Sequence, residues 1–516
     1  MGSRLSLCVL LQLGCITIPA CSSSFTPTPC TTDSDCADTS YVCEIRQSSP
    51  VCVLATDAPI LIGQSAPYSG TNQALGIGMK LGAQLAIDEQ NAKGGIRGRM
   101  IQLVARDDGY DPIQAEGNAR TLVDAKVSAA APLCPNTANP VSNGAVPPAL
   151  IPVSTTAIER GPNAVLALLG DVGTPTAVRA APVAIESGTL FFGAFTGAGT
   201  LLRDMSSGPC AKYIFNVRAS YAQEADATLQ YFLHKGVADY RDLVSFDQND
   251  TFGQAGYDGL KAAYTNNVGA FPGTADPTNP IQRFRYTRND DTSVPAQAAA
   301  AETYLYNRLL AAAPGAKVQI GIMMTDTYGA GASFIQALRD WQNANDSQQT
   351  MQDKANRLVL HFSNVSFVGP NALSDTLKGY GNYTMPLGGQ VPYTNEVVVS
   401  QVVPNYHDDL SDVVQDYNKL IMTAGEQPGF TSLEGYIATR VFIGGLLNNQ
   451  GPFTPDALVT AFESLPDLGL GIGASAGFSP TNHQYSSSVW GTNIQTDGTF
   501  KNLYFWTSGH PIQFFQ

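Results

Sequence analysis

The sequence is poor in charged residues and contains no long apolar run. Charged side chains make up 14% of the chain, and the formal net charge is -14. Nucleic-acid binding requires clustered Lys and Arg, so this balance argues against it, and it also disfavours electrostatic docking on anionic lipid. No internal stretch approaches the roughly 18 apolar residues of a spanning helix. A hydrophobic share of 44% over 516 residues still allows sizeable cores and two or three folding units.

The N-terminus differs from the rest of the chain. Arg4 precedes an apolar run from Leu5 to Leu13, and a second short apolar stretch ends at Ala20. A basic residue, a short apolar core and a small residue before a cleavage point predict a secretory signal over residues 1–21. Cys21 follows Ala20 directly, which predicts a bacterial lipoprotein signal with Cys21 as the acylated residue. Cys15 is a second candidate, and an ordinary cleaved signal is the alternative.

The nine cysteines support export. Cys8 and Cys15 leave with the signal and Cys21 carries lipid, which leaves the even number that a disulfide framework requires. Four lie in a polar segment, residues 22–57, that is too short for an apolar core, so disulfides must staple this linker. These are Cys30, Cys36, Cys43 and Cys52. A zinc site lacks the usual spacing, and the neighbouring acids Asp33, Asp35 and Asp38 are read as solvated loop residues rather than calcium ligands. We expect the remaining cysteines, Cys134 and Cys210, to pair in the main body.

From residue 58 onward, short apolar strands alternate with helices. Strands are predicted at 59–65, 100–106, 164–169, 189–192, 243–246, 318–323 and 357–362. Small polar residues and a helix start follow most of them. This rhythm predicts an α/β fold of doubly wound parallel sheets, in which ligands bind at the carboxyl edge of the strands. Residues 130–161 resemble an insertion, and residues 270–280 and 343–356 are predicted polar loops.

Several motifs, in order and spacing, resemble one family. They include Ile62-Gly63-Gln64, Asn91-Ala92-Lys93-Gly94-Gly95, Gly173-Thr174-Pro175-Thr176, Asn216-Val217-Arg218-Ala219-Ser220-Tyr221 and Ser432-Leu433-Glu434-Gly435-Tyr436. From about residue 58 to 515 the chain resembles the type I periplasmic binding proteins, specifically the branched-chain amino-acid (Leu/Ile/Val-type) receptors of ABC importers. The Cys-rich segment and the 130–161 insertion depart from the family pattern.

The resemblance implies two lobes joined by a three-crossing hinge. The first lobe would comprise residues 58–216 and 403–495, and the second lobe residues 217–402 and 496–516. The crossings would fall near Phe215–Ala219, Ser400–Val403 and Tyr504–Trp506. The ligand would lie between the lobes.

The expected ligand contacts follow strand ends. Thr174 and Thr176 follow a glycine turn at a helix start, where orphan N–H groups and the helix dipole favour a carboxylate; plain N-capping is the alternative. The resemblance favours the ligand role. It adds Thr196 and Gly197 as ligand contacts, with Phe195 as a cleft wall or core residue.

On the second lobe the resemblance places Tyr221 as an aromatic lid over the ligand. It places Thr325 and Tyr328 in a ligand-touching loop. Asp250 is read as a helix cap. Ser366 lies where the branched-chain receptors carry an acid for the α-amino group, so an uncharged Ser argues against a simple amino-acid ligand. Tyr68 and Ser69 are expected rim contacts, or turn residues.

An enzyme is the less favoured alternative. Gly473-Ala474-Ser475-Ala476-Gly477 matches the nucleophile elbow of serine hydrolases, with His483 near in sequence. That motif needs a strand before it and a helix after it, whereas this region is rich in turns. The five histidines show no metal-ligand spacing.

No cofactor, metal or catalytic residue is therefore expected. The sequence predicts a periplasmic or envelope lipoprotein that binds a small polar ligand, such as an amino acid, amide or organic acid, and delivers it to an ABC permease. A ligand-sensing lipoprotein that signals to a membrane partner is the other reading.

Overall fold

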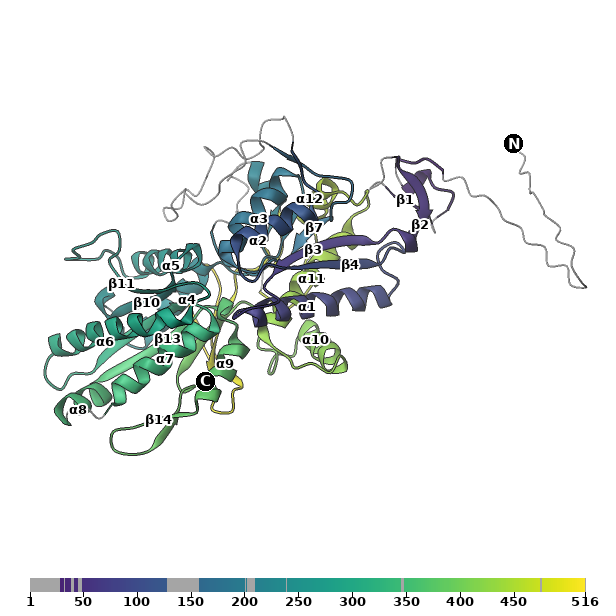
Figure 1. Ribbon diagram of the computed structural model, residues 1–516. Coiled ribbons are helices and arrows are strands. Elements are labelled where there is room, and N and C mark those ends of the chain that lie inside the picture. Colours follow the sequence, from purple (N-terminus) through teal and green to yellow (C-terminus); the bar gives the residue numbers. More distant parts are fainter. Residues whose placement is uncertain are drawn as a thin grey trace, which may run out of the picture.

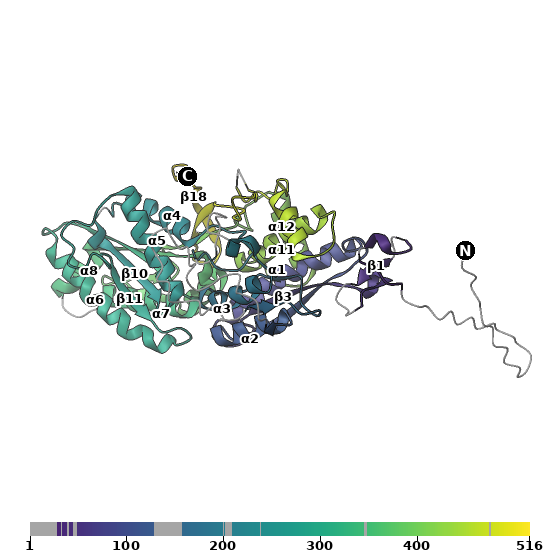
Figure 2. The same ribbon diagram turned by 90° about the horizontal axis from the view of Figure 1, so that it is seen from above.

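The computed structural model describes residues 28–31, 33–38, 41–44, 49–127, 157–199, 201, 209–237, 239–344, 348–473 and 476–515. Cys21, Cys134 and most of the 130–161 insertion lie outside these residues, as do the side chain of Cys210 and all of Ser475. The described chain forms two lobes that lie end to end, with a small N-terminal module beyond the first lobe (Figures 1 and 2).

The first lobe is built on a parallel five-stranded sheet in the order β4-β3-β7-β8-β9. Its strands are β3 (Ile60–Ala66), β4 (Ile101–Asp107), β7 (Ala167–Leu169), β8 (Leu190–Phe192) and β9 (Ile214–Phe215). Its helices are α1 (Gln73–Ala92), α2 (Pro112–Leu122), α3 (Thr174–Glu186), α10 (Asp412–Thr423), α11 (Phe430–Asn448) and α12 (Pro455–Glu463). The α2–α3 pair covers one face of the sheet, and α1 and α11 pack together on the other (Figure 1). A short hairpin, β5 (Lys126–Val127) with β6 (Ile158–Glu159), flanks the insertion.

The second lobe is built on an eight-stranded sheet in the order β11-β10-β12-β13-β16-β17-β18-β19. Its strands are β10 (Leu243–Gln248), β11 (Gln282–Tyr286), β12 (Val318–Thr325), β13 (Leu358–Asn364), β16 (Val397–Gln401), β17 (Val489–Ile494), β18 (Phe500–Trp506) and β19 (Gln513–Phe514). Pairing is parallel as far as β16 and antiparallel beyond it.

Helices cover both faces of this second sheet as well. They are α4 (Tyr221–His234), α5 (Thr251–Asn267), α6 (Val294–Ala311), α7 (Tyr328–Asn343), α8 (Gln348–Arg357) and α9 (Pro370–Tyr380). A small hairpin, β14 (Asn382–Thr384) with β15 (Gln390–Pro392), completes the lobe. Phe232 of α4 packs close to Gly321 of β12, while Phe334 of α7 stacks on Phe246 of β10 with ring centroids 3.9 Å apart. An aromatic side chain thus packs on each face of the sheet, and the α/β fold of two doubly wound lobes is confirmed.

The chain passes between the lobes after β9, after β16 and before β17. Asn216 of the first passage exchanges backbone hydrogen bonds with His483 and Tyr485, so the first and third passages run side by side. The predicted third crossing at Tyr504–Trp506, and with it the first-lobe boundary at residue 495, is therefore wrong. β17 pairs antiparallel with β16, which moves residues 489–494 into the second sheet.

A second expectation also fails. Residues 343–356 were predicted to form a polar loop, but α8 occupies Gln348–Arg357. The helix contains no Gly or Pro, and half of its residues are the good helix formers Gln, Lys and Arg, so polarity alone did not indicate a loop. Among the described residues, no helix combines the length and apolar character needed to cross a membrane.

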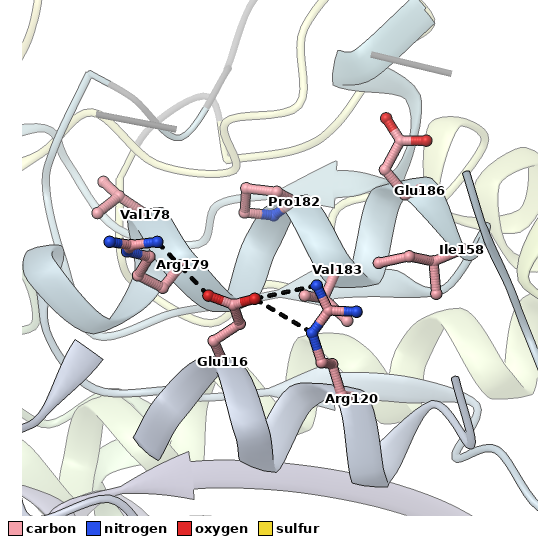
Figure 3. A pocket seen from close by; sticks show the side chains of 8 residues that line it. All are labelled: Glu116, Arg120, Ile158, Val178, Arg179, Pro182, Val183 and Glu186. Carbon is pink, nitrogen blue, oxygen red and sulfur yellow. Dashed lines mark hydrogen bonds and ion pairs between the residues drawn. The ribbon is translucent and has the colours of Figure 1, made fainter. Parts of the chain in front are cut away.

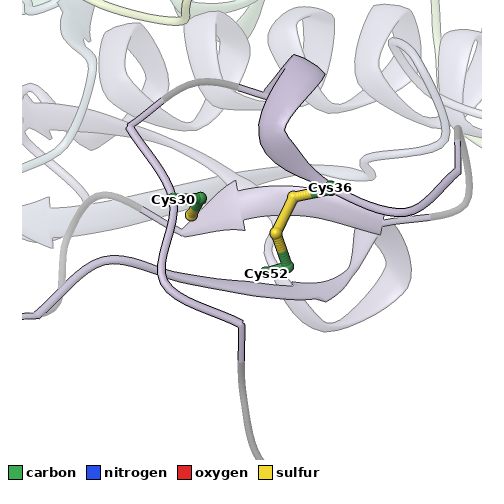
Figure 4. A group of neighbouring side chains, drawn as sticks. All are labelled: Cys30, Cys36 and Cys52. Atoms are coloured by element: carbon green, nitrogen blue, oxygen red, sulfur yellow. A yellow bond between two sulfur atoms is a disulfide. The ribbon is translucent and has the colours of Figure 1, made fainter. Parts of the chain in front are cut away.

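The Cys-rich segment forms a compact module. Strands β1 (Tyr41–Glu44) and β2 (Val51–Leu54) pair antiparallel, and the disulfides Cys30–Cys43 and Cys36–Cys52 staple them. The sulfur atoms of Cys30, Cys36 and Cys52 lie close together (Figure 4), but all three are in disulfides, so none is a thiolate ligand for a metal.

The module is docked on the first lobe. Val42, Ala55 and Ala58 form a buried apolar contact where β2 leads into β3, and the Arg99 side chain donates to the Ala58 carbonyl at 2.6 Å. The Cys-rich segment therefore meets the first lobe at the start of β3, where Ala55 also lies beside Gly98.

We expect the α1–α11 contact to be intolerant of even one methyl group. A Cβ on Gly82 would lie 1.8 Å from the Ser432 carbonyl oxygen and 2.6 Å from the Tyr436 nitrogen. Gly82→Ala should therefore lower the free energy of unfolding by about 1–3 kcal/mol or more, measured by urea denaturation. Gly117→Ala in α2 is the matched control, because nothing lies within 4 Å of its Cβ. It should raise stability by about 0.5–1 kcal/mol. Equal effects of the two changes would contradict this packing.

Candidate functional site

The candidate site lies between the lobes, where the carboxyl ends of both sheets meet. Loops after β7 and β8 come from the first lobe, and loops after β10, β12 and β13 come from the second. Parallel sheets bind ligands at this edge. The side chains that meet here form an ionic group, a hydroxyl group, an aromatic cluster and a rim contact.

The ionic group is centred on Arg218, in the first passage between the lobes. Its buried guanidinium pairs with Glu434 of α11 at 3.2 Å and with Glu224 of α4 at 2.8 Å, and it also donates to the Ser366 hydroxyl. The Glu224 carboxylate accepts further bonds from the backbone N–H and hydroxyl of Ser366 and from the hydroxyl of Ser400. Arg218 thus joins Glu434 of the first lobe to Glu224 of the second.

The pKa values in this group reflect deep burial opposed by pairing. Burial lowers the pKa of Arg218, but Glu434 and Glu224 outweigh it, and the net shift is upward. Burial raises the pKa of Glu434 to about 7, although Arg218 acts against the rise. Removing one partner of such a buried pair costs about 3–5 kcal/mol, because the other charge is left uncompensated.

The hydroxyl group gathers at the start of α3. The buried Thr174 and Thr196 hydroxyls lie 2.7 Å apart, beside the first turn of that helix. The Thr176 hydroxyl instead donates to the Val172 and Gly173 carbonyls of its own turn. This bond runs back to the carbonyls of its own turn and is not an N-cap, since the N-cap residue is Gly173. The ligand roles of Thr174, Thr176 and Thr196 stay predictions.

Tyr221 completes the hydroxyl group from the second lobe. Its ring packs on Gly197, where a Cβ would lie 2.7 Å from the ring, so glycine permits this close approach. The Tyr221 hydroxyl is buried near Thr196 but makes no hydrogen bond of good geometry with the described residues. Burial raises its pKa to about 12. This hydroxyl is therefore free to bond a ligand atom, although the buried hydroxyls of Tyr485 and Tyr504, outside the site, also lack a partner among the described residues.

An aromatic cluster adjoins these hydroxyls. Phe367 directly follows Ser366. The centroid of its ring lies 5.0 Å from that of Phe195 and 6.1 Å from that of Tyr110 in the first lobe, and 4.7 Å from that of Phe252 in the second. Tyr221 lies 5.4 Å from Phe252. All five rings are buried. Phe195, predicted as a cleft wall or core residue, is a wall of the interlobe junction.

A rim contact closes the junction toward solvent. Asn72 donates to the Asn289 side chain at 2.8 Å, and Asn289 donates to the Gly109 carbonyl at 3.2 Å. Tyr328, predicted to touch ligand, donates its hydroxyl to the Thr71 carbonyl of the first lobe. We call these five residues the interlobe clasp.

The other predicted residues have partners or lie elsewhere. The Tyr68 hydroxyl donates to Gln64 and the Ser69 hydroxyl to Asp107. The Thr325 hydroxyl is buried near Gly256 of α5, without a partner among the described residues. Asp250 accepts from the Phe252 N–H, as a helix cap does.

Two buried acids flank β3 in the first lobe. Asp108 accepts from the Ser65 hydroxyl, and Asp171 accepts from the Ser65 N–H at 2.9 Å. Burial, with a smaller contribution from repulsion by Asp107 and Asp111, raises the pKa of Asp108 to about 7. Burial, with repulsion by Asp108, raises the pKa of Asp171 to about 8.

A pocket on the outer surface of the first lobe is a weaker candidate. It lies between α2 and α3, where Glu116 accepts from Arg120 at 3.0 Å and faces Arg179 at 3.5 Å (Figure 3). These partly exposed charges neutralise one another, and the pocket receives no residue from the second lobe.

The hydrolase reading gains no support from His483. Its ring stacks on Phe215, and its nitrogens face the Ile214 carbonyl and Glu463. The imidazole is a buried structural group beside the first passage. Its proposed partner Ser475 lies outside the described residues.

Sequence reasoning missed most of the ionic group and the aromatic partners. Arg218 and Glu434 stood inside family-like motifs without an assigned role. Glu434 is an isolated acid in the apolar first half of α11, which is a signal for a buried pair. The sequence holds no comparable signal for Asn289. Its positive φ of 58° is a property of the fold.

Comparison with known proteins agrees with this architecture. A sequence model of the family described as "Periplasmic binding protein" matches residues 59–164. A Leu/Ile/Val-binding protein homolog 2 of Brucella abortus is 42% identical over 66 residues, 13% of this chain and 18% of that protein. An amino acid binding protein of Pseudomonas aeruginosa is 42% identical over 67 residues. The match therefore spans less than a fifth of the curated relatives' length.

Solved structures match over a much longer range. A possible leucine/isoleucine/valine-binding protein from Rhodopirellula baltica has a TM-score of 0.63 and 29% identity, covering 86% of this chain and 96% of that one. A fatty acid ABC transporter substrate-binding protein from Thermomonospora curvata has a TM-score of 0.59 at 17% identity, covering 88% and 94%. The second likeness shows the fold alone.

The predicted resemblance to the type I periplasmic binding proteins is thereby confirmed. Within that class, the chain resembles the Leu/Ile/Val-binding branch. The fold and the relatives are those of binding proteins rather than enzymes.

We expect Asp171 to make stability depend on pH. Its folded pKa of about 8 lies above the usual aspartate value, so the folded state holds a proton that the unfolded state has lost. The contribution of Asp171 to stability should therefore fall as pH rises from about 4 to 8, by about 1.4 kcal/mol per pH unit at most. Asp171→Asn should flatten this fall, as measured by urea denaturation at pH 5 and 7.5.

Asp107→Asn is the control. Hydrogen bonds from Ser69 and from neighbouring N–H groups lower the pKa of Asp107 against the effect of burial, so that group does not titrate in this range. An unchanged pH slope in Asp171→Asn would contradict the assignment.

We also expect the interlobe clasp to set the balance between open and closed forms. Asn289→Gly removes two interlobe hydrogen bonds and suits the positive φ, so the backbone should stay in place. The closed form should lose about 1–2 kcal/mol of stabilisation, which should raise the fraction of molecules in the open form several-fold or more. The open fraction can be measured by energy transfer between two dyes, one attached at the exposed Ile113 of the first lobe and one at the exposed Leu310 of the second. Glu396→Gly, at another exposed positive-φ position, should leave transfer unchanged.

Proposed function

We propose that the chain is an extracytoplasmic solute-binding lipoprotein, anchored through Cys21, that captures a small ligand between its lobes and delivers it to an ABC permease. Tyr221 is the observation that carries this proposal. Its buried, unpartnered hydroxyl comes from the second lobe and lies beside Thr196 of the first, which in turn bonds Thr174.

Closure and binding are coupled in this arrangement. A ligand touching Tyr221 and Thr174 contacts both lobes only in the closed form, so it stabilises that form by its difference in affinity for the two. The Leu/Ile/Val-binding and amino acid binding relatives support a role in solute capture. The family resemblance supports a location outside the cytoplasm.

A thermal-shift screen of amino acids, amides and organic acids tests the proposal. A ligand held at 100 times its dissociation constant should add about 2.7 kcal/mol of apparent stability. If no compound in a broad panel moves the midpoint, the proposal fails.

Tyr221→Phe separates a ligand contact from a structural role. Because the hydroxyl lacks a good partner, its removal should leave the stability of the unliganded protein unchanged or raise it by up to about 1 kcal/mol. Ligand affinity should fall about tenfold, measured by calorimetry with a ligand from the screen.

Tyr257→Phe is the matched control. Its buried hydroxyl donates to the Ile281 carbonyl at 3.1 Å, so its removal should cost about 1 kcal/mol of stability and leave affinity unchanged. If Tyr221→Phe instead lowers stability and spares affinity, Tyr221 is a core residue.

A further inference from the structure

Three oxygen atoms at the end of the second sheet are buried without a hydrogen-bond partner among the described residues. Two belong to the carboxyl group of Asp326, directly after β12, and the third is Oδ1 of Asn364, the last residue of β13. Both side chains are fully buried. A buried oxygen without a donor costs free energy, so three of them in one place indicate a missing partner.

The three oxygens lie together because the two strands are neighbours. β12 and β13 pair in parallel, with Met324 opposite Asn364. A Cβ on Gly331, in the first turn of α7, would lie 2.0 Å from Asp326 Oδ2 and 3.5 Å from Asn364 Oδ1. The Asn364 amide nitrogen donates to the Val398 carbonyl, which leaves Oδ1 on the side of Gly331. The absence of a side chain at Gly331 makes room for this group of oxygens.

No positive charge compensates the carboxylate of Asp326. Among the described residues, no basic side chain bonds either of its oxygens. Burial, and to a lesser degree repulsion by the half-buried Asp291, raises the pKa of Asp326 well above its usual value. A proton alone does not satisfy the group, because the O–H would find no acceptor and Asn364 Oδ1 would still lack a donor. A cation would satisfy all three oxygens at once.

The group of oxygens lies on the side of the second lobe that meets the first. Tyr328, two residues after Asp326, donates to the Thr71 carbonyl as part of the interlobe clasp. Ser366, two residues after Asn364, belongs to the ionic group. The oxygens therefore lie between the clasp and the ionic group, at the sheet edge where ligands bind, and opening of the clasp gives access from solvent.

The number of oxygens and their charge select the kind of cation. A primary ammonium has three N–H donors, which match the three unfilled acceptors. Calcium takes about six to eight oxygen ligands and magnesium a near-ideal octahedron, and three oxygens do not supply either. One carboxylate also balances one positive charge rather than two. The group therefore suits a monovalent cation.

We propose that Asp326 and Asn364 form a binding site for one monovalent cation, either an ammonium group carried by the solute or a free sodium or potassium ion. The first source rests on the proposed solute-binding function, and the second does not. With either source, the cation lies beside Gly331 and the interlobe clasp closes over it.

Asp171 is the competing acceptor, in the first lobe. Its Oδ2 is buried without a partner among the described residues, but it is one atom rather than three. Asp171→Asn is therefore the matched comparison for Asp326→Asn, because each change replaces a buried acid by its neutral isostere.

The free-ion source is tested by the unfolding temperature of the purified chain in sodium, potassium and choline chloride at equal ionic strength and pH 7.5. Choline is too large to be held by three oxygens at one place. A free ion well above its dissociation constant should raise the midpoint by about 2 °C or more over choline chloride. Asp326→Asn should remove this difference, and Asp171→Asn should keep it. A response to calcium chloride alone would overturn the monovalent class.

The solute source is tested by calorimetry in choline chloride with L-leucine, 4-methylpentanoate and 3-methylbutylamine. These probes share one branched alkyl body, and only the first and third carry an ammonium. Asp326→Asn should lower the affinity for the ammonium-bearing probes at least tenfold and leave that for 4-methylpentanoate within twofold. An amine-bearing hit from the thermal-shift screen replaces L-leucine if L-leucine does not bind.

Gly331→Ala tests the same place without removing the acid. Its methyl group would displace the Asp326 carboxylate, and because that contact is a side chain rather than backbone, the fold should survive while the response to the cation is lost. This variant also replaces Asp326→Asn if the latter does not fold. Gly379→Ala in α9 is its control, because nothing lies within 4 Å of that Cβ, and it should keep the response.

The outcomes separate the cation site from solute capture. A response lost in Asp171→Asn but kept in Asp326→Asn overturns the assignment to Asp326. If no ion changes the midpoint and Asp326→Asn binds its solute as tightly as the unchanged chain, the cation site is overturned while solute capture stands. If no solute in the broad panel binds, solute capture fails, and the ion measurement still decides the cation site.

Discussion

The two-lobed structure depends on one buried guanidinium. Arg218 lies in a passage between the lobes and pairs with an acid from each, so the ionic group acts as a common fixed point. A buried charge cannot be left uncompensated without a large cost, which requires the first passage, α4 and α11 to keep their relative positions. Movement of the lobes is then confined to the side away from Arg218.

The interactions farther from Arg218 are weaker and more easily exchanged. The interlobe clasp consists of neutral hydrogen bonds, partly exposed to water, each worth about 0.5–1.5 kcal/mol. The aromatic cluster between them is held by ring packing rather than by charge pairing. The ionic group around Arg218 holds the lobes together strongly, whereas the interlobe clasp holds them weakly. The free-energy difference between the open and closed forms is therefore small, and a ligand of ordinary affinity can shift the balance.

Much of the fold follows from local patterns, whereas the site depends on distant pairings. The strands ending at Ala66 and Thr325 could be predicted because apolar runs, turns and helix starts are local signals. The position of β17 could not, because its antiparallel pairing with β16 joins segments about 90 residues apart. Arg218 and Glu434 are separated by 216 positions, and no local pattern relates them. Thr174 was identifiable from its glycine turn, but only the structure shows that Thr176 turns its hydroxyl back into the helix.

The docking of the disulfide-stapled module has a mechanical consequence. The module joins the first lobe at the start of β3, and the second lobe lies at the opposite end of the molecule (Figure 2). A pull on the N-terminal side therefore enters the first sheet along β3 and does not pass through Arg218 or the three passages. A load on the N-terminal side and bending at the hinge are therefore carried by separate parts of the chain.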